Sequence, residues 1–413
     1  MTPTPQTVQR TYYALMLCNT LAASFIWGIN TLFLLDAGLT NTEAFAANAF
    51  FTGGQVLFEV PTGVVADTWG RRTSYLLGAF TLMLSTLLYL AMWKVHAPFW
   101  GWAVASLLLG LGFTFFSGAV EAWLVDALDF TGFSRAGGQL DKVFARGQQI
   151  AGAAMLVGSV LGGAVAQATN LGVPYILRTA VLAVTLAVAF VMMKDLGFEP
   201  QRSERVWAGM KQTLTDSISY GLCNRPVRWL VLAGPFGAGV GMYAFYAMQP
   251  YLLKLNGDPK AYGVAGLAAA IVAGAQMVGG LLVPHARRLF RRRTSVLIAS
   301  VLLSSLLLAM LSRIGHFAFA VGVLTLWALV FACVMPVRQT YLNGLIESRR
   351  RATVLSFDSL VSSSGGMFSQ PLLGKVADLQ GYGVSYLVGA AIQLGAVPFL
   401  LLARAENVGS DDL

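Results

Sequence analysis

The chain has 413 residues, of which 56% are hydrophobic and only 11% are charged, and its mean hydropathy is +0.66. A soluble domain carries roughly 25% charged residues because its surface faces water, so this composition excludes an ordinary soluble protein. The net charge of +9 is compatible with nucleic-acid binding, but the placement of the basic residues argues against it. The three cysteines are far apart and predict neither a metal site nor a disulfide framework.

Apolar runs of about 20 residues, the length of a helix that crosses a bilayer, recur along the whole chain. They predict an all-α integral membrane protein with twelve transmembrane helices, at roughly 12–35, 44–66, 74–93, 99–124, 145–168, 174–193, 229–253, 262–284, 294–312, 317–342, 354–375 and 382–403. One long polar stretch separates the first six from the last six. We therefore expect a six-helix bundle over 1–193, a cytoplasmic linker over 194–228 and a second six-helix bundle over 229–413.

The basic residues indicate the orientation of these spans. If the N-terminus is cytoplasmic, most of the 28 Lys and Arg lie in or beside cytoplasmic segments, as the positive-inside rule requires. The exceptions are Lys94, Lys254, Lys260, Arg313 and Lys375 outside, and Arg178 and Arg338 within spans. This distribution predicts a multi-pass protein of the cell's inner membrane with both termini in the cytoplasm, and it leaves no basic surface for nucleic acid.

The two halves of the sequence resemble each other. Residues 71–74 and 292–295 both read Arg-Arg-Thr-Ser, and they open the third and ninth spans. Residues 120–126, near the end of the fourth span, correspond to 337–343 near the end of the tenth, at a similar offset. These matches predict two pseudo-symmetric bundles that arose by duplication and that rock about a central site.

The segment between the second and third spans, residues 63–72, reads Gly-Val-Val-Ala-Asp-Thr-Trp-Gly-Arg-Arg. It resembles the signature loop of the major facilitator superfamily, Gly-x-x-x-Asp-x-x-Gly-Arg-Arg/Lys, with every fixed position present: Gly63, Asp67, Gly70, Arg71 and Arg72. Glycine permits close packing and tight turns, an acid is favoured at a helix N-terminus, and arginine forms charge-assisted pairs.

The resemblance implies a secondary transporter that works by alternating access. In that family the loop latches the cytoplasmic side when the transporter faces outward, so Asp67 is expected near Thr353 and Arg71 is expected to pair with Asp126. The equivalent loop of the second half, 284–293, keeps the arginines but has no matching Asp, so a second latch is expected to be weaker or absent.

A second motif lies in the fifth span. Gly158, Gly162 and Gly163 match the family's antiporter motif, Gly-x-x-x-Gly-Pro-x-x-Gly-Gly, although Ala154 replaces its first glycine and Ser159 its proline. This similarity suggests the drug:proton antiporter-like branch. Small residues at this spacing also serve ordinary helix packing, and both interpretations stay open.

Four charged residues are predicted inside spans, near their cytoplasmic ends: Glu59, Glu121, Arg338 and Asp358. Charge within a membrane is costly and commonly functional. One hypothesis is a permanent ion-pair cluster; the favoured one is a gate that breaks and re-forms while one acid exchanges a proton. In particular, Glu121 and Arg338 are expected to face each other across the bundles.

Six polar or aromatic residues are candidates for a substrate cavity near the middle of the membrane, although each of them taken singly is more often a packing residue. They are Asn19, Trp27, Asn30, Tyr243, Tyr246 and Gln249. A largely apolar cavity with few polar groups suits an amphipathic small molecule.

These features predict a monomeric, proton-coupled exporter of a small organic or amphipathic solute, without a cofactor or metal. A proton-coupled importer of a small metabolite is the closest alternative, and a non-transporting membrane sensor or scaffold is a more distant one. A membrane enzyme is disfavoured because the spans contain no catalytic motif.

Overall fold

The computed structural model describes residues 4–116, 118–133, 135–198, 200, 221–347 and 351–411, with the backbone alone for 280, 282–289 and 352–353. Within these ranges every regular element is a helix, as the apolar runs predict. Most of the expected linker, 194–228, falls outside the described residues.

Over its described residues the first half contains eight helices, because two of the predicted spans are broken. α1 and α2 meet at a bend of 48° within the first expected span, and Gly118, with φ at 70°, divides the fourth expected span into α5 and α6. The helices are α1 (Pro5–Trp27), α2 (Asn30–Asp36), α3 (Asn41–Trp69), α4 (Arg71–Val95), α5 (Phe99–Phe116), α6 (Ala119–Phe130), α7 (Leu140–Ala168) and α8 (Gly172–Met192).

The second half begins at residue 225, a few residues before the expected boundary at 229. Its helices are α10 (Arg225–Asn256), α11 (Tyr262–Leu289), α12 (Arg293–Leu311), α13 (Phe317–Leu345), α14 (Arg351–Leu394) and α15 (Ala396–Ala405), followed by the 3-10 turn η2 (Gly409–Asp411). α14 bends at Gly381, where φ is 83°. This bend lies in the gap predicted between the last two spans.

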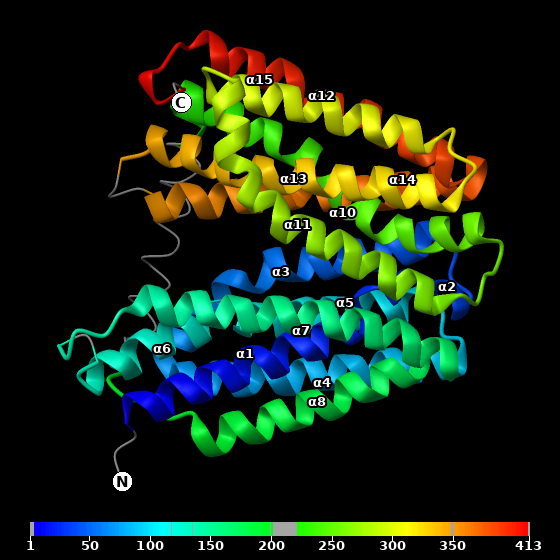
Figure 1. Cartoon of the computed structure of the whole chain (residues 1–413). Helices are drawn as coiled ribbons and strands as arrows, with labels where there is room; N and C mark the ends of the chain where they lie inside the picture. Colours follow the sequence, from blue (N-terminus) through cyan, green and yellow to red (C-terminus); the bar gives the residue numbers. More distant parts are fainter. Residues whose placement is uncertain are drawn as a thin grey trace.

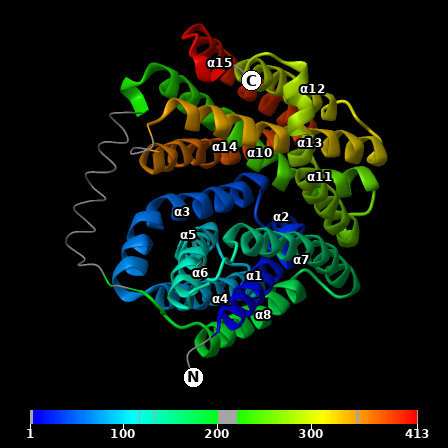
Figure 2. The same ribbon diagram turned by 60° about the vertical axis from the view of Figure 1, so that its left-hand side comes forward.

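The two halves lie side by side, with α1–α8 in one and α10–α15 in the other (Figures 1 and 2). α3 packs against α14, and α7 packs against α11, along the seam between them. Both chain ends lie at the same end of the bundle (Figure 1), which we call the termini face. α2 and the turn between α10 and α11 lie at the opposite end, which we call the far face.

Nine helices of the described chain are long and apolar enough to cross a membrane, or ten if the bent pair α1 and α2 is one span. α3 is not among them; it carries polar residues such as Asn48 and Glu59 and packs along the seam against α14. The multi-pass, all-helical architecture is therefore established, while the number twelve stays a prediction.

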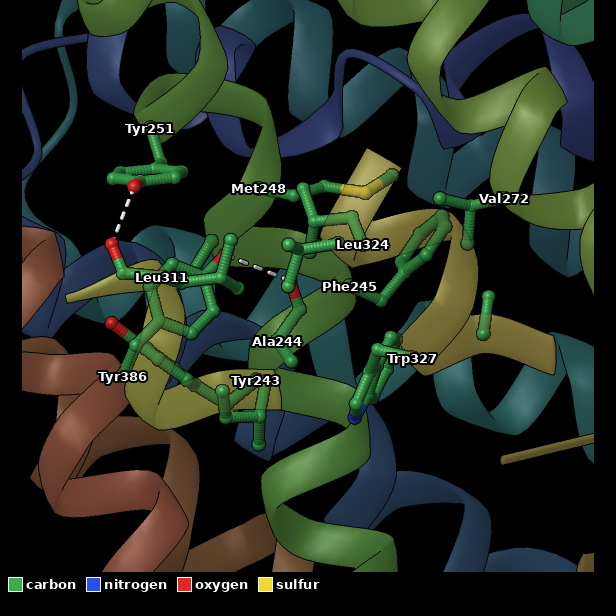
Figure 3. Close-up of a cluster of buried hydrophobic side chains, with 14 of the residues drawn as sticks. Tyr243, Ala244, Phe245, Met248, Tyr251, Val272, Leu311, Leu324, Trp327 and Tyr386 are labelled. Carbon is green, nitrogen blue, oxygen red and sulfur yellow. Dashed lines mark hydrogen bonds between the residues drawn. The ribbon is translucent and has the colours of Figure 1, made fainter. Parts of the chain in front are cut away.

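Buried tyrosines tie the helices of the second half together (Figure 3). The Tyr251 hydroxyl donates to the carbonyl oxygen of Leu311 at 2.6 Å, and the Tyr386 hydroxyl donates to that of Ala244 at 3.2 Å. An apolar interior supplies no water to satisfy such hydroxyls, so they bond to backbone carbonyls. These bonds fix α10 against α12 and α14.

In each half, an aspartate located after the last helix binds the first turn of the third predicted span. These two spans are α4 and α12. Asp195 accepts a hydrogen bond from the backbone N–H of Arg72 at 2.8 Å, at the start of α4. Asp411 accepts one from the backbone N–H of Thr294, also at 2.8 Å, at the start of α12. Both carboxylates satisfy amides that a helix N-terminus leaves free. The equivalent use of both acids supports the predicted duplication.

Candidate functional site

At the far face, one carboxylate joins the two halves. Asp378 of α14 accepts hydrogen bonds from the backbone and side-chain amides of Asn41, both at 2.9 Å. It also accepts from the backbone N–H and the hydroxyl of Thr42, at 2.9 and 2.5 Å. These residues open α3, so the acid lies at a helix N-terminus, where negative charge is favoured. These hydrogen bonds therefore hold the two halves together at the far face.

Gln249 of α10 reinforces this closure at the break between α1 and α2. Its side-chain amide donates to the carbonyl oxygen of Trp27 and accepts from the backbone N–H of Thr31, both at 2.9 Å. A broken helix leaves such backbone groups without intrahelical partners. Gln249, which the sequence suggested as a cavity residue, is therefore part of the far-face contacts in this conformation.

A cavity of about 430 Å³ lies mainly in the second half, with Trp27 of α1 lining it from the first half, between the middle of the bundle and the termini face. Trp27 and Tyr246 lie at its deep end, and Arg338 and Leu400 lie toward the termini face. Its volume is in the usual range for sites that bind small molecules. Most of the wall is apolar; its aromatic side chains are Trp27, Phe245, Tyr246, Trp327 and Phe331, and its polar ones include Gln276, Ser300, Ser304, Ser362 and Gln393.

A bidentate ion pair lies at the cavity wall. The two terminal guanidinium nitrogens of Arg338 contact the two carboxylate oxygens of Asp358 at 2.7 and 2.5 Å. One of these nitrogens also donates to the carbonyl oxygen of Leu230 at 3.1 Å. The side chains are only 15% and 9% exposed, so each charge depends on the other, because an unpaired buried ion is costly.

The other two charged candidates lie on the first half. Glu121 on α6 and Glu59 on α3 are both exposed. In this conformation Arg338 pairs with Asp358 rather than with Glu121. The expected bridge between the bundles therefore remains a prediction for a conformation in which the termini face is closed.

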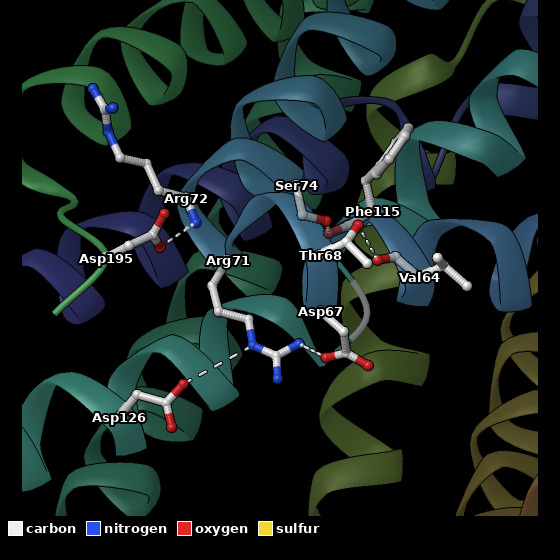
Figure 4. A network of polar contacts seen from close by, with 9 residues as sticks. All are labelled: Val64, Asp67, Thr68, Arg71, Arg72, Ser74, Phe115, Asp126 and Asp195. Carbon is white, nitrogen blue, oxygen red and sulfur yellow. Dashed lines mark hydrogen bonds and ion pairs between the residues drawn. The ribbon is translucent and has the colours of Figure 1, made fainter. Parts of the chain in front are cut away.

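The signature loop forms the junction between α3 and α4 (Figure 4). Arg71 lies between two acids: Nη1 is 2.6 Å from Oδ1 of Asp67, and Nε is 4.0 Å from Oδ2 of Asp126. The expected pair of Arg71 with Asp126 is thus present, although its atoms lie at the outer limit of ion-pair distance. Asp67 forms a shorter ion pair with Arg71 within the loop. The expected partner Thr353 has no described side chain. Gly63 lies in α3, about one helical turn before Asp67.

The loop turns at Gly70, the single residue between the two helices. Its φ of 105° is unfavourable for residues with a side chain, and a Cβ there would overlap the carboxylate of Asp195. Next to it, the Arg72 guanidinium donates to the carbonyl oxygen of Phe190 at 2.8 Å and lies over that ring. Gly70 and Arg72 thus anchor the loop to the end of α8.

The glycines of the antiporter-like motif lie where α7 contacts its neighbours. A Cβ at Gly158 would overlap the Ser24 hydroxyl, and one at Gly162 would overlap the carbonyl oxygen of Phe25, both on α1. A Cβ at Gly163 would lie 2.7 Å from the carbonyl oxygen of Tyr262 on α11. The motif therefore permits close packing with both helices, including packing across the seam.

Of the six cavity candidates, Trp27 and Tyr246 line the cavity. Asn30 instead donates to Asn48 at 3.0 Å and accepts from the Tyr175 hydroxyl at 2.9 Å, within the first half. Tyr243 is buried and accepts a hydrogen bond from Ser385. Asn19 is half-buried on α1 and does not contribute to the cavity wall.

Several residues of the site were not identified from the sequence. Ser304 and Gln393, which are hydrogen-bonded to each other at 2.9 Å, line the cavity, and nothing in their local sequence distinguishes them. Asp378 and Asp195 also required the tertiary structure.

The comparisons with known proteins agree on one fold. The family model described as Major Facilitator Superfamily matches residues 12–370. The structure is similar to that of the nucleoside transporter NupG, with a TM-score of 0.77 at 12% identity, covering 97% of this chain and 98% of that one. A crystal structure of a mutant of that protein gives 0.78 at 14%, covering 96% and 99%.

The POT family transporter PepTSo is also similar, with a TM-score of 0.71 at 13% identity, covering 98% of this chain and 99% of that one. No curated protein matches the chain. At such low identities the solved structures establish the fold alone.

Proposed function

The chain belongs to the major facilitator superfamily, and we propose that it exports a small amphipathic solute by alternating access, in exchange for protons taken up at Asp358. It is a transporter rather than an enzyme, and it sits in lipid and binds a small molecule. The solute class, the direction and the coupling ion are the proposed part.

The cavity is the observation that carries this proposal. Its wall is mostly apolar and aromatic, with a few amides and hydroxyls, and the charge of its lining residue Arg338 is neutralised by the bidentate pair with Asp358. Such a wall suits a solute with an apolar body and a few polar groups. The far-face contacts of Asp378 and Gln249 close one end of the pathway, which supports a conformation that receives solute from the termini face. By the positive-inside rule this is the cytoplasmic side of the inner membrane.

We assign the proton exchange to Asp358 because it is the acid that pairs with Arg338. When its carboxylate takes up a proton, Arg338 loses the one carboxylate with which it pairs in the described part of the chain. An arginine without a partner at that depth is costly, so it is driven toward another acid, and Glu121 holds the repeat-related position on the first half. In this scheme Arg338 pairs with Asp358 when that acid is ionised and with Glu121 when that acid is protonated. The protein acts as a monomer in this scheme, because each chain contains both halves of the gate.

We expect solute-driven proton flux to depend on Asp358. The test uses inverted membrane vesicles with an acidic lumen and a panel of labelled amphipathic compounds. Antiport predicts accumulation of a substrate in the lumen as protons leave, whereas symport predicts the opposite direction. Asp358→Asn should reduce gradient-driven accumulation at least about tenfold, or about 1.4 kcal/mol, while solute exchange without a gradient continues.

The matched control is Asp258→Asn, which makes the same change at an exposed acid in the turn between α10 and α11. If wild type and Asp358→Asn accumulate the substrate to the same extent under the proton gradient, another group couples solute movement to protons. A protein that moves none of the compounds in either direction would contradict the proposed transport.

We also expect Glu121 and Arg338 to approach each other when the termini face closes. Either single reversal, Glu121→Arg or Arg338→Glu, should reduce transport, and the two effects should not add in the double variant, because both changes break the same pair. The double variant is not expected to restore transport, because a glutamate at position 338 would lie against Asp358. Distances between spin labels on α6 and α13 should show a shorter population in the wild type than in Glu121→Gln. Single reversals that transport normally would place the gate elsewhere.

A further inference from the structure

Two nearly fully buried polar side chains from different helices meet at the cavity wall. Ser304 on α12 is 3% exposed and Gln393 on α14 is 5% exposed. The Gln393 amide nitrogen donates to the Ser304 hydroxyl at 2.9 Å, and that hydroxyl donates to the amide oxygen at 3.3 Å. Both residues line the cavity. The wall therefore presents a hydroxyl and an amide as one polar unit, which we call the Ser–Gln pair.

The Ser–Gln pair keeps hydrogen-bonding capacity for a ligand. A glutamine amide has two N–H donors and an oxygen with two lone pairs. Ser304 uses one donor and one lone pair of Gln393, and within the described chain this side chain forms no other hydrogen bond. One N–H donor and one acceptor position therefore remain on the same planar group.

The wall around the Ser–Gln pair is uncharged. Ser300 lines the cavity one helical turn from Ser304 on α12, and Gln276 of α11 contributes a second amide. Among the described residues that line the cavity, only Arg338 is charged, and Asp358 neutralises it. A charged solute group buried at such a wall would lose its hydration without gaining a counter-ion, which is costly. The wall therefore favours an uncharged polar group.

We propose that the Ser–Gln pair recognises the polar group of the transported solute, and that this group is uncharged and carries a donor beside an acceptor, as a primary carboxamide does. Its carbonyl oxygen accepts from the free N–H of Gln393, and its own N–H donates to the Gln393 oxygen. Its apolar body lies against the stacked rings of Trp327 and Phe331 in the same cavity, whose centroids are 5.6 Å apart. This assignment rests on the proposed transport and specifies its substrate class.

A pair that only joined α12 to α14 would behave differently. Hydrogen bonds between polar side chains commonly join helices within membranes, and the loss of such a bond lowers stability without changing which ligand binds. Recognition by the Ser–Gln pair instead predicts that its removal changes the selectivity among ligands. The two roles are therefore separated by comparing affinities rather than stability alone.

The first test measures binding to the purified protein, so it depends neither on the direction of transport nor on protons. Phenyl, indol-3-yl and 1-naphthyl bodies are each tested as the acetamide, the methyl acetate ester, the acetate and the ethylamine. For every body that binds, the acetamide should bind about tenfold more tightly than the ester, which offers no N–H donor. The two charged forms should bind more weakly still. Preference for the ester or for a charged form, or no binding by any of these compounds, would overturn the assignment.

The second test asks whether the Ser–Gln pair causes that preference. Gln393→Met keeps an unbranched side chain and removes the amide, so the ratio of acetamide to ester affinity should fall about tenfold, while the affinity for the ester changes by less than about twofold. Gln149→Met makes the same exchange at an exposed position on α7 and should leave the ratio unchanged. A lower melting temperature with an unchanged ratio in Gln393→Met would show that the pair only joins helices.

If Gln393→Met does not fold, Ser304→Ala takes its place. This variant removes the hydroxyl that orients the Gln393 amide, so the ratio of acetamide to ester affinity should fall at least about threefold. A wild-type ratio in Ser304→Ala would then contradict recognition by the pair.

The vesicle experiment separates this assignment from the proposed function. Transport of the acetates or the ethylamines but not of the acetamides would leave the proposed function standing and refute the solute class alone. Selective binding of an acetamide by a protein that transports none of the compounds would contradict the proposed transport and retain the Ser–Gln pair as a binding site.

Discussion

Asp378→Asn is expected to shift the protein strongly toward a conformation that is open at the far face. In the structure this carboxylate accepts four hydrogen bonds from the first turn of α3. An asparagine has no charge for the helix N-terminus, and its NH₂ group would face an N–H donor. We estimate a loss of about 1–2 kcal/mol from the closed state, which corresponds to a five- to thirtyfold change in the ratio of conformations.

Double electron–electron resonance between labels at Lys94→Cys and Arg313→Cys measures this shift, because both positions are exposed and lie on opposite halves at the far face. Asp258→Asn is again the matched control, since its acid bonds within its own turn. An unchanged distance distribution in Asp378→Asn, or the same shift in Asp258→Asn, would show that Asp378 does not hold the halves together.

Asp67→Asn is expected to reduce transport at least about tenfold, or about 1.4 kcal/mol, while the protein stays folded. Arg71 would keep only the 4.0 Å contact with Asp126, so the junction between α3 and α4 would lose its shorter ion pair. Half-exposed pairs contribute about 0–1 kcal/mol to stability, so the melting temperature should change by only a few degrees. The large effect is therefore expected on the exchange between conformations.

Transport and thermal unfolding are measured together for Asp67→Asn, Arg71→Ala and the control Asp129→Asn. Asp129 is an exposed acid on the same helix as Asp126, so the control changes the same charge near the loop without touching its pairs. Wild-type transport by both loop variants would sink the assignment of a latch to Asp67 and Arg71.

The sequence by itself determined the membrane-embedded, all-helical architecture and the family, because both depend on local properties. Apolar runs decide which segments enter lipid, and the fixed residues of the signature loop occur within ten consecutive positions, 63–72. The positions at which the helices break could not be predicted from the sequence. The division of the first span between Trp27 and Asn30 depends on Gln249 of the other half, which satisfies the freed backbone groups.

The candidate site likewise combines residues that the sequence identifies with contacts that only the structure shows. An intramembrane charge such as Arg338 is visible in the sequence, but its partner is a matter of geometry, and the structure selects Asp358, twenty residues later, over Glu121 on the other half. Likewise, Asp378 lies 336 residues after the Thr42 that it binds. Hydrogen bonds and ion pairs act over about 3–4 Å, and only the packing of the helices brings residues this far apart in the chain within that distance.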